Sequence, residues 1–141
     1  MSTASPRPDR PEQALPSAPT RVLVVDDNHD SADSLSALLG LLGYEACAIY
    51  DGFEALERVE SFRPDVVVLD IGMPRMNGYE LARRLRTRPA LQGILIVAVT
   101  GYGQARDRLL SFEAGINYHV VKPLNTEVLL KLIETHVARS S

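Results

Sequence analysis

The sequence predicts an α/β fold in which a doubly wound, five-stranded parallel sheet has the strand order 2-1-3-4-5. Short valine-rich runs, such as "RVLVV" and "DVVVLD", are typical of strands that are buried on both faces of a parallel sheet. A segment with apolar residues at helical spacing follows each run. This alternation indicates successive βαβ units with right-handed crossovers.

Strands and helices alternate along most of the chain. Strands are expected at residues 21–25, 44–50, 65–70, 93–100 and 118–122. Helices are expected at residues 31–42, 52–62, 78–86, 103–115 and 126–138. Gly43 and Gly115 are typical helix stops, and Pro64 closes the second helix. Together these elements predict one domain at residues 21–139.

The first 20 residues differ in composition from the rest of the chain. They contain five prolines, together with serine, alanine and threonine, and almost no large apolar side chains. Such a segment cannot bury enough apolar surface to offset the entropy of ordering it. Residues 1–20 are therefore expected to form a disordered tail.

The overall composition is that of a globular protein, with 45 % hydrophobic and 23 % charged residues. The net charge of −3 argues against a nucleic-acid-binding surface, which would be basic and clustered. Cys47 is the single cysteine, so an internal disulfide is excluded. The sequence shows no apolar run of roughly 18 residues and no secretory signal. We therefore expect a cytoplasmic protein without nucleic-acid or membrane partners.

Polar side chains stand at the ends of four predicted strands. Asp26 and Asp27 follow the first strand, Asp70 ends the third, Thr100 ends the fourth and Lys122 ends the fifth. These four strands are neighbours in the predicted order, and parallel strands place their carboxyl ends at one edge of the sheet. The five side chains are therefore expected to converge at that edge.

This set of side chains predicts phosphoryl chemistry. Three close carboxylates repel one another, and a hard divalent cation with oxygen ligands, Mg²⁺, relieves that repulsion. Asp26, Asp27 and Asp70 therefore predict a magnesium site. The cation and Lys122 can hold a phosphoryl group against a carboxylate nucleophile, and the Thr100 hydroxyl can donate to a phosphoryl oxygen.

A structural role is the alternative for Asp26 and Asp27 taken alone. Aspartate is common in turns and as a helix cap, and Asn28 or Asp30 is expected to cap the first helix. The functional interpretation is favoured for the five strand-end residues together, because chance rarely puts all of them at adjacent strand ends.

Four segments together resemble the response regulator receiver domain of two-component signalling, a chemotaxis-regulator-like module with a flavodoxin-like fold. They read "VLVVDDN", "VVVLDIGMPRMNGYE", "AVTGYG" and "HVVKPL". The resemblance covers residues 21 to about 138. It implies that Asp70 is the phosphorylated residue. It also implies that Asp27 and Asp70 bind Mg²⁺ directly with the main-chain carbonyl of Gly72, while Asp26 supports the metal, often through water.

The resemblance also assigns the residues around the phosphoryl group. Thr100 and Lys122 are expected to contact it, and the Lys122–Pro123 peptide bond is expected to be cis. Tyr102 lies at a position that tunes the lifetime of the phosphoryl group in this family.

In the family, the switch moves the threonine toward the phosphoryl group and turns inward an aromatic side chain three residues before the lysine. His119 occupies that position in this sequence. Two interpretations stay open for it. The imidazole either takes the steric part of the aromatic ring and adds pH sensitivity, or it lies exposed on the fifth strand.

The implied function is a phosphoacceptor switch. A sensor histidine kinase or histidine phosphotransfer protein donates the phosphoryl group to Asp70, and protein binding changes through the surface formed by residues of about 103–138. The reaction is stoichiometric with slow self-dephosphorylation, so no enzymatic turnover is expected. A monomer or a weak phosphorylation-dependent dimer is expected. No output domain is expected, so the chain is expected to be either a free-standing regulator or a receiver excised from a hybrid histidine kinase.

Rival functions from other classes are less consistent with the sequence. An aspartyl-nucleophile phosphatase of the haloacid-dehalogenase type usually carries Asp-x-Asp and a cap domain, whereas Asp26 and Asp27 are adjacent. A flavin carrier would need a hydroxyl- and amide-rich loop where this chain has "DDNHD". An inactive pseudo-receiver is disfavoured because all the expected site residues are present.

Overall fold

The computed structural model describes residues 18–101 and 108–140. Five parallel strands form one sheet in the order β2-β1-β3-β4-β5, which confirms the predicted topology. The strands are β1 (Arg21–Val25), β2 (Glu45–Ile49), β3 (Val66–Asp70), β4 (Leu95–Thr100) and β5 (Tyr118–Val121). The helical elements are α1 (His29–Leu41), α2 (Gly52–Phe62), α3 (Gly78–Arg86), the 3₁₀ turn η2 (Pro89–Leu91), α4 (Arg108–Ala114) and α5 (Thr126–Ser140).

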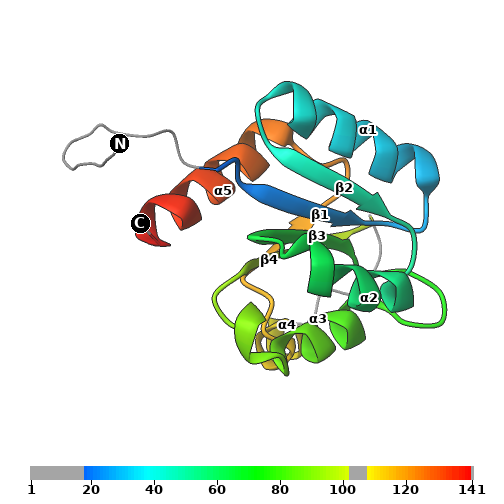
Figure 1. The fold of residues 1–141 in the computed structure, drawn as a ribbon. Coiled ribbons are helices and arrows are strands. Elements are labelled where there is room, and N and C mark those ends of the chain that lie inside the picture. The colour runs from blue at the N-terminus through cyan, green and yellow to red at the C-terminus, as the bar shows by residue number, and fades with distance from the viewer. Residues whose placement is uncertain (1–17, 102–107, 141) are drawn as a thin grey trace.

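Helices cover both faces of the sheet. Figure 1 shows α1 and α5 on one face, and α2, α3 and α4 on the other. Alternate strand residues point to opposite faces, so the buried residues form two clusters. Leu23, Leu69 and Ile96 belong to the cluster on the α2–α4 face. Val24 and Val68 belong to the cluster on the α1–α5 face. This double burial is the reason that the central strands read as continuous apolar runs.

The ends of several elements differ from the prediction. Helix α1 begins at His29, two residues early, because the Asn28 side chain caps it by accepting a hydrogen bond from the Ser31 amide at 3.0 Å. This resolves the choice between the two expected caps. Helix α4 is described from Arg108, and residues 103–107 of the predicted helix lie outside the described part of the chain. The turn η2 was not predicted.

Of the expected disordered tail, residues 1–17 lie outside the described part of the chain. Residues 18–20 precede β1, and the carbonyl of Thr20 accepts a hydrogen bond from the Glu45 amide at 2.9 Å. This bond extends the pairing of β1 with β2 by one step.

In residues 18–101 and 108–140, no helix is long and apolar enough to cross a membrane.

The Arg86 side chain ties three segments together at the end of α3. Its guanidinium donates hydrogen bonds to the carbonyls of Leu91 (3.0 Å), Gln92 (3.1 Å) and Gly115 (2.9 Å), and to the Asn117 side-chain oxygen (2.9 Å). Burial lowers the pKa of the guanidinium from its ordinary value. The charge is nevertheless retained because arginine is too basic to lose it near neutral pH.

Replacement of this arginine is expected to destabilise the fold. Arg86→Ala removes one donor from each of four oxygen atoms, and we expect the free energy of unfolding to fall by about 2–4 kcal/mol in urea denaturation. Arg83→Ala is the matched control, because Arg83 lies on the same helix with an exposed ion pair of 3.7 Å to Glu80. It should change stability by less than about 0.5 kcal/mol. Equal losses in the two variants would contradict the role given to Arg86.

Candidate functional site

Three carboxylates meet at the carboxyl ends of β1 and β3. Asp26 follows β1 directly, and Asp70 is the last residue of β3, the neighbouring strand. Asp26 is 8 % exposed and Asp70 is 6 % exposed, whereas Asp27 is exposed. One oxygen atom from each of the three carboxylates lies within 4.8 Å of the others. The structure therefore brings together the three aspartates that the sequence singled out.

Backbone contacts hold two of these carboxylates in place. The Asn28 amide donates to Asp26 Oδ1 at 3.0 Å, and the Gly72 amide donates to Asp70 Oδ1 at 3.2 Å. The Asp26 amide donates to the Ile49 carbonyl at 3.0 Å, which extends the pairing of β1 with β2. The chain therefore orients the carboxylates through its own turns.

Lys122 brings a positive charge to the same edge of the sheet. Its Nζ atom lies 3.7 Å from Asp70 Oδ1 and 3.9 Å from Asp26 Oδ2. The Lys122 amide donates to the Thr100 carbonyl at 2.7 Å, and the Lys122–Pro123 peptide bond is cis, as the resemblance implies. One ammonium group thus faces three carboxylates.

The charges at the site favour binding of a cation in addition to the Lys122 ammonium. The pKa of the Asp70 carboxyl is raised, mainly by burial and also by the charges of Asp26 and Asp27. The Gly72 hydrogen bond and the Lys122 charge act in the opposite direction, and they do not outweigh the burial. Carboxylate oxygens at this spacing are suitable ligands for a hard divalent cation such as Mg²⁺. The described residues therefore fit the predicted metal.

Thr100 completes the ring of strand-end residues. It is the last residue of β4, is fully buried, and its hydroxyl lies 3.5 Å from the Val120 carbonyl, at the limit of a hydrogen bond. The distance leaves the hydroxyl weakly held in this structure.

The loop that follows Asp70 is fixed by a close approach of α3. Asn77 caps this helix by accepting from the Glu80 amide at 3.0 Å. A Cβ atom on Gly78 would lie 2.8 Å from the Asp70 carbonyl oxygen and 2.8 Å from Ile71 Cα. The start of α3 therefore packs directly against the backbone of the strand end, and only glycine fits there. Met76 is buried in the same loop, as expected of a packing residue.

Of the predicted switch residues His119 and Tyr102, the structure describes His119. His119 is half-buried on β5, so its side chain is not simply exposed, and it faces α3 and α4. Its neighbour Tyr118 is exposed, in keeping with the alternation of a strand. Tyr102 lies outside the described residues.

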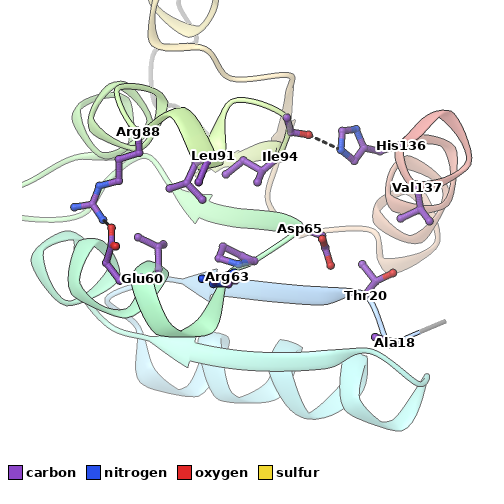
Figure 2. A pocket seen from close by; sticks show the side chains of 14 residues that line it. Ala18, Thr20, Glu60, Arg63, Asp65, Arg88, Leu91, Ile94, His136 and Val137 are labelled. Carbon is purple, nitrogen blue, oxygen red and sulfur yellow. Dashed lines mark hydrogen bonds and ion pairs between the residues drawn. The ribbon is translucent and has the colours of Figure 1, made fainter. Parts of the chain in front are cut away.

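The described residues line a cavity at each end of the strands, and the sequence predicted neither. A cavity of about 690 Å³ lies between α1 and α5 and reaches Asp26, Asp70 and Lys122. A second one, of about 700 Å³, lies at the amino-terminal edge of the sheet, opposite the carboxylates. Figure 2 shows its lining from α2, η2 and α5. Both are lined by segments far apart in sequence, so no local motif signals them.

Side chains in the second cavity are engaged with the protein itself. Arg88 forms a 2.5 Å ion pair with Glu60, and His136 Nε2 lies 3.1 Å from the Gly93 carbonyl oxygen (Figure 2). These contacts join α2 to η2 and α5 to the start of β4. The cluster in which three carboxylates and the Lys122 ammonium lie close together is thus the better candidate for chemistry.

Comparisons with known proteins identify the family of this chain. The family model of the response regulator receiver domain matches residues 22–134. The chain is 36 % identical over 123 residues to the response regulator MprA of Mycobacterium sp. (strain KMS), covering 87 % of this chain and 53 % of that protein. The chain thus spans about half the length of the curated relatives that it matches.

Solved structures give the same result. A response regulator from Chloroflexus aurantiacus J-10-fl aligns with a TM-score of 0.77 and 31 % identity, covering 85 % of this chain and 98 % of that one. The receiver domain of a signal transduction histidine kinase from Syntrophus aciditrophicus aligns with a TM-score of 0.75 and 30 % identity, covering 84 % and 90 %. The fold is that of a CheY-like receiver. The chain belongs to the response regulator receiver domain family of two-component signalling.

Proposed function

We propose that this domain, residues 21–139, is a phosphoacceptor switch in which Asp70 takes a phosphoryl group from a histidine kinase or a histidine phosphotransfer protein. One observation carries the proposal. Asp70 is buried at the strand switch point, with the Lys122 ammonium 3.7 Å from its carboxylate and two further carboxylates beside it. Each of these groups has a use in phosphoryl transfer.

The proposed metal ligands are Asp27, Asp70 and the main-chain carbonyl of Gly72, with Asp26 in support. Mg²⁺ bound there supplies positive charge for the oxygens of the transferring group. The spacing of the three carboxylates supports this assignment, because a cation relieves their mutual repulsion.

The chain's own residues supply the remaining steps. A carboxylate oxygen of Asp70 attacks the phosphorus of the donor phosphohistidine, the P–N bond breaks, and its electron pair leaves on the imidazole. Lys122 pairs with a phosphoryl oxygen, and the Thr100 hydroxyl donates to another. Water later attacks the phosphorus, releases inorganic phosphate and restores the carboxylate. The reaction is therefore stoichiometric, and slow self-dephosphorylation resets the domain.

The proposed output is a change in protein binding at the α4–β5–α5 surface. Exposed apolar side chains on it support this proposal, since Phe112 is 81 % exposed and Leu109 is 64 % exposed on α4. Tyr118 of β5 is exposed as well. We propose a monomer or a weak phosphorylation-dependent dimer in the cytoplasm, where the free thiol of Cys47 is stable.

A second candidate is the same module within a hybrid histidine kinase. The similarity to the Syntrophus aciditrophicus receiver, which is part of a histidine kinase, favours it. The chemistry at Asp70 is the same for both candidates, and they differ in where the phosphoryl group goes next.

The intact mass of the protein tests the proposed function. We expect incubation with acetyl phosphate and Mg²⁺ to add the mass of one phosphoryl group, and incubation with EDTA to prevent it. Binding of beryllofluoride with Mg²⁺ is the parallel test when the adduct decays quickly. A protein that forms no adduct and binds no beryllofluoride would contradict the proposal.

Magnesium binding should depend on Asp27. Because the carboxylate of Asp27 is one of three around the site, Asp27→Asn is expected to weaken Mg²⁺ affinity by about tenfold or more in calorimetric titration. Asp30→Asn is the matched control, since Asp30 is an exposed acid in the first turn of α1 outside the cluster. Equal affinities for the two variants would argue against a metal held by Asp27.

A further inference from the structure

A buried hydroxyl outside the carboxylate site calls for an explanation. Among the described residues, four polar or charged side chains are buried: Asp26, Asp70, Thr100 and Ser111. The first three belong to the strand-end site. Ser111 lies on α4 and is 7 % exposed. A hydroxyl that is buried to this extent normally has a hydrogen-bond partner. That partner is His119.

Contacts from two helices hold the His119 ring. Ser111 Oγ lies 2.9 Å from His119 Nδ1, a hydrogen bond between α4 and β5. Tyr79 of α3 meets the same ring edge-to-face, with centroids 6.3 Å apart and planes at 80°. Aromatic pairs favour this geometry. The ring therefore lies fixed between α3 and α4.

The strand register places this ring next to Thr100. His119 pairs with Ala98, and Thr100 pairs with Val121, the residue two positions after His119. Alternation therefore puts Thr100 and His119 on the same face of adjacent strands, two positions apart in the register. Ala98 is small, so the sheet surface beside Thr100 has room for the imidazole.

We propose that Ser111 is a positioning residue, which holds His119 inward and thereby couples α4 to Thr100. This proposal rests on the proposed function, in which Thr100 contacts the phosphoryl group. With the imidazole anchored by Ser111, the space beside Thr100 is already filled before phosphorylation. A displacement of Thr100 moves the His119 ring, and the hydrogen bond from the ring to Ser111 transmits this movement to α4.

Loss of the hydroxyl should lower the affinity of the site for a phosphoryl mimic. In Ser111→Ala the ring is free to leave its inward position, and the apparent affinity falls with the fraction of molecules that keep it there. Because one neutral hydrogen bond is lost, we expect Mg²⁺-dependent beryllofluoride affinity to fall by about twofold to tenfold. Ser111 acts through His119, so Ser111→Ala should have no effect in a His119→Phe background.

The imidazole nitrogen signals in NMR test the contact without any ligand. We expect Ser111→Ala to shift the Nδ1 signal of His119 and to leave those of His29 and His136 unchanged. An unchanged His119 signal, or equal losses of beryllofluoride affinity in the two backgrounds, would overturn the proposal. If the wild-type protein binds no beryllofluoride, the proposed function and the coupling both fail, whereas the imidazole signals still decide whether Ser111 positions His119.

Discussion

Asp70→Asn is expected to abolish the phosphoryl adduct and to make the metal-free protein more stable at neutral pH. The adduct is lost because the amide is not a nucleophile that accepts the phosphoryl group. The stability rises because the variant removes a buried negative charge that lies beside two others. A change that removes activity and adds stability is typical of a charged site kept for function.

The gain in stability should depend on pH, and its sign follows from the pKa. Burial raises the folded-state pKa of Asp70 above its ordinary value of 3.8. Between these two values the folded protein binds more protons than the unfolded chain, so stability falls as the pH rises through that window. Thermal unfolding without metal should show this fall in the wild type and a smaller one in Asp70→Asn.

The comparison has a direct control. Below the ordinary value of 3.8 the carboxyl of Asp70 is protonated in both states, and the gain in Asp70→Asn should disappear. Asp30→Asn removes an exposed charge and should not stabilise the protein at neutral pH. If the unfolding temperature depends on pH in the same way for the wild type and Asp70→Asn, burial of the Asp70 charge beside two other carboxylates does not destabilise the fold, and this account of the site is refuted.

Gly78→Ala, at the first residue of α3, is expected to destabilise the packing of this helix against the end of β3. The new methyl group would lie 2.8 Å from both the Asp70 carbonyl oxygen and Ile71 Cα, and backbone atoms cannot move aside as a flexible side chain does. We expect a loss of about 1–3 kcal/mol in the free energy of unfolding. The displacement reaches Asp70, so Mg²⁺ affinity should fall as well.

Gly40→Ala is the matched control for this substitution. Gly40 is exposed on α1, and a Cβ atom there meets nothing within 4 Å. Alanine should stabilise the helix by about 0.5–1 kcal/mol and leave Mg²⁺ binding unchanged. Urea denaturation and metal titration of both variants separate the effect of the close approach from a general effect of adding a methyl group. A Gly78→Ala protein as stable as the wild type would disprove the close approach.

Much of the fold and of the site could be predicted because burial determines both. The runs at β1 and β3 are apolar at four consecutive positions, which is typical of a strand covered on both faces. Polar residues directly after such runs mark the strand ends. Parallel pairing then brings Asp26 and Asp70 to one edge, although 43 residues separate them.

Other features depend on packing between distant segments and had no local signal. The Arg86 hydrogen bonds join α3 to η2 and to the residue after α4, so they depend on how these segments pack together. The position of His119 is of the same kind. Its place in the sequence allowed an exposed or an inward ring, and the contacts with Ser111 and Tyr79 distinguish them.

The most direct test of the central claim is the identity of the carboxylate that carries the phosphoryl group. Borohydride reduces an aspartyl phosphate to homoserine, and peptide mass spectrometry then locates the modified residue. After treatment with acetyl phosphate and Mg²⁺, we predict homoserine at position 70, and none when EDTA replaces Mg²⁺. Homoserine at Asp26 or Asp27 in place of Asp70, or modification that does not depend on Mg²⁺, would contradict the account.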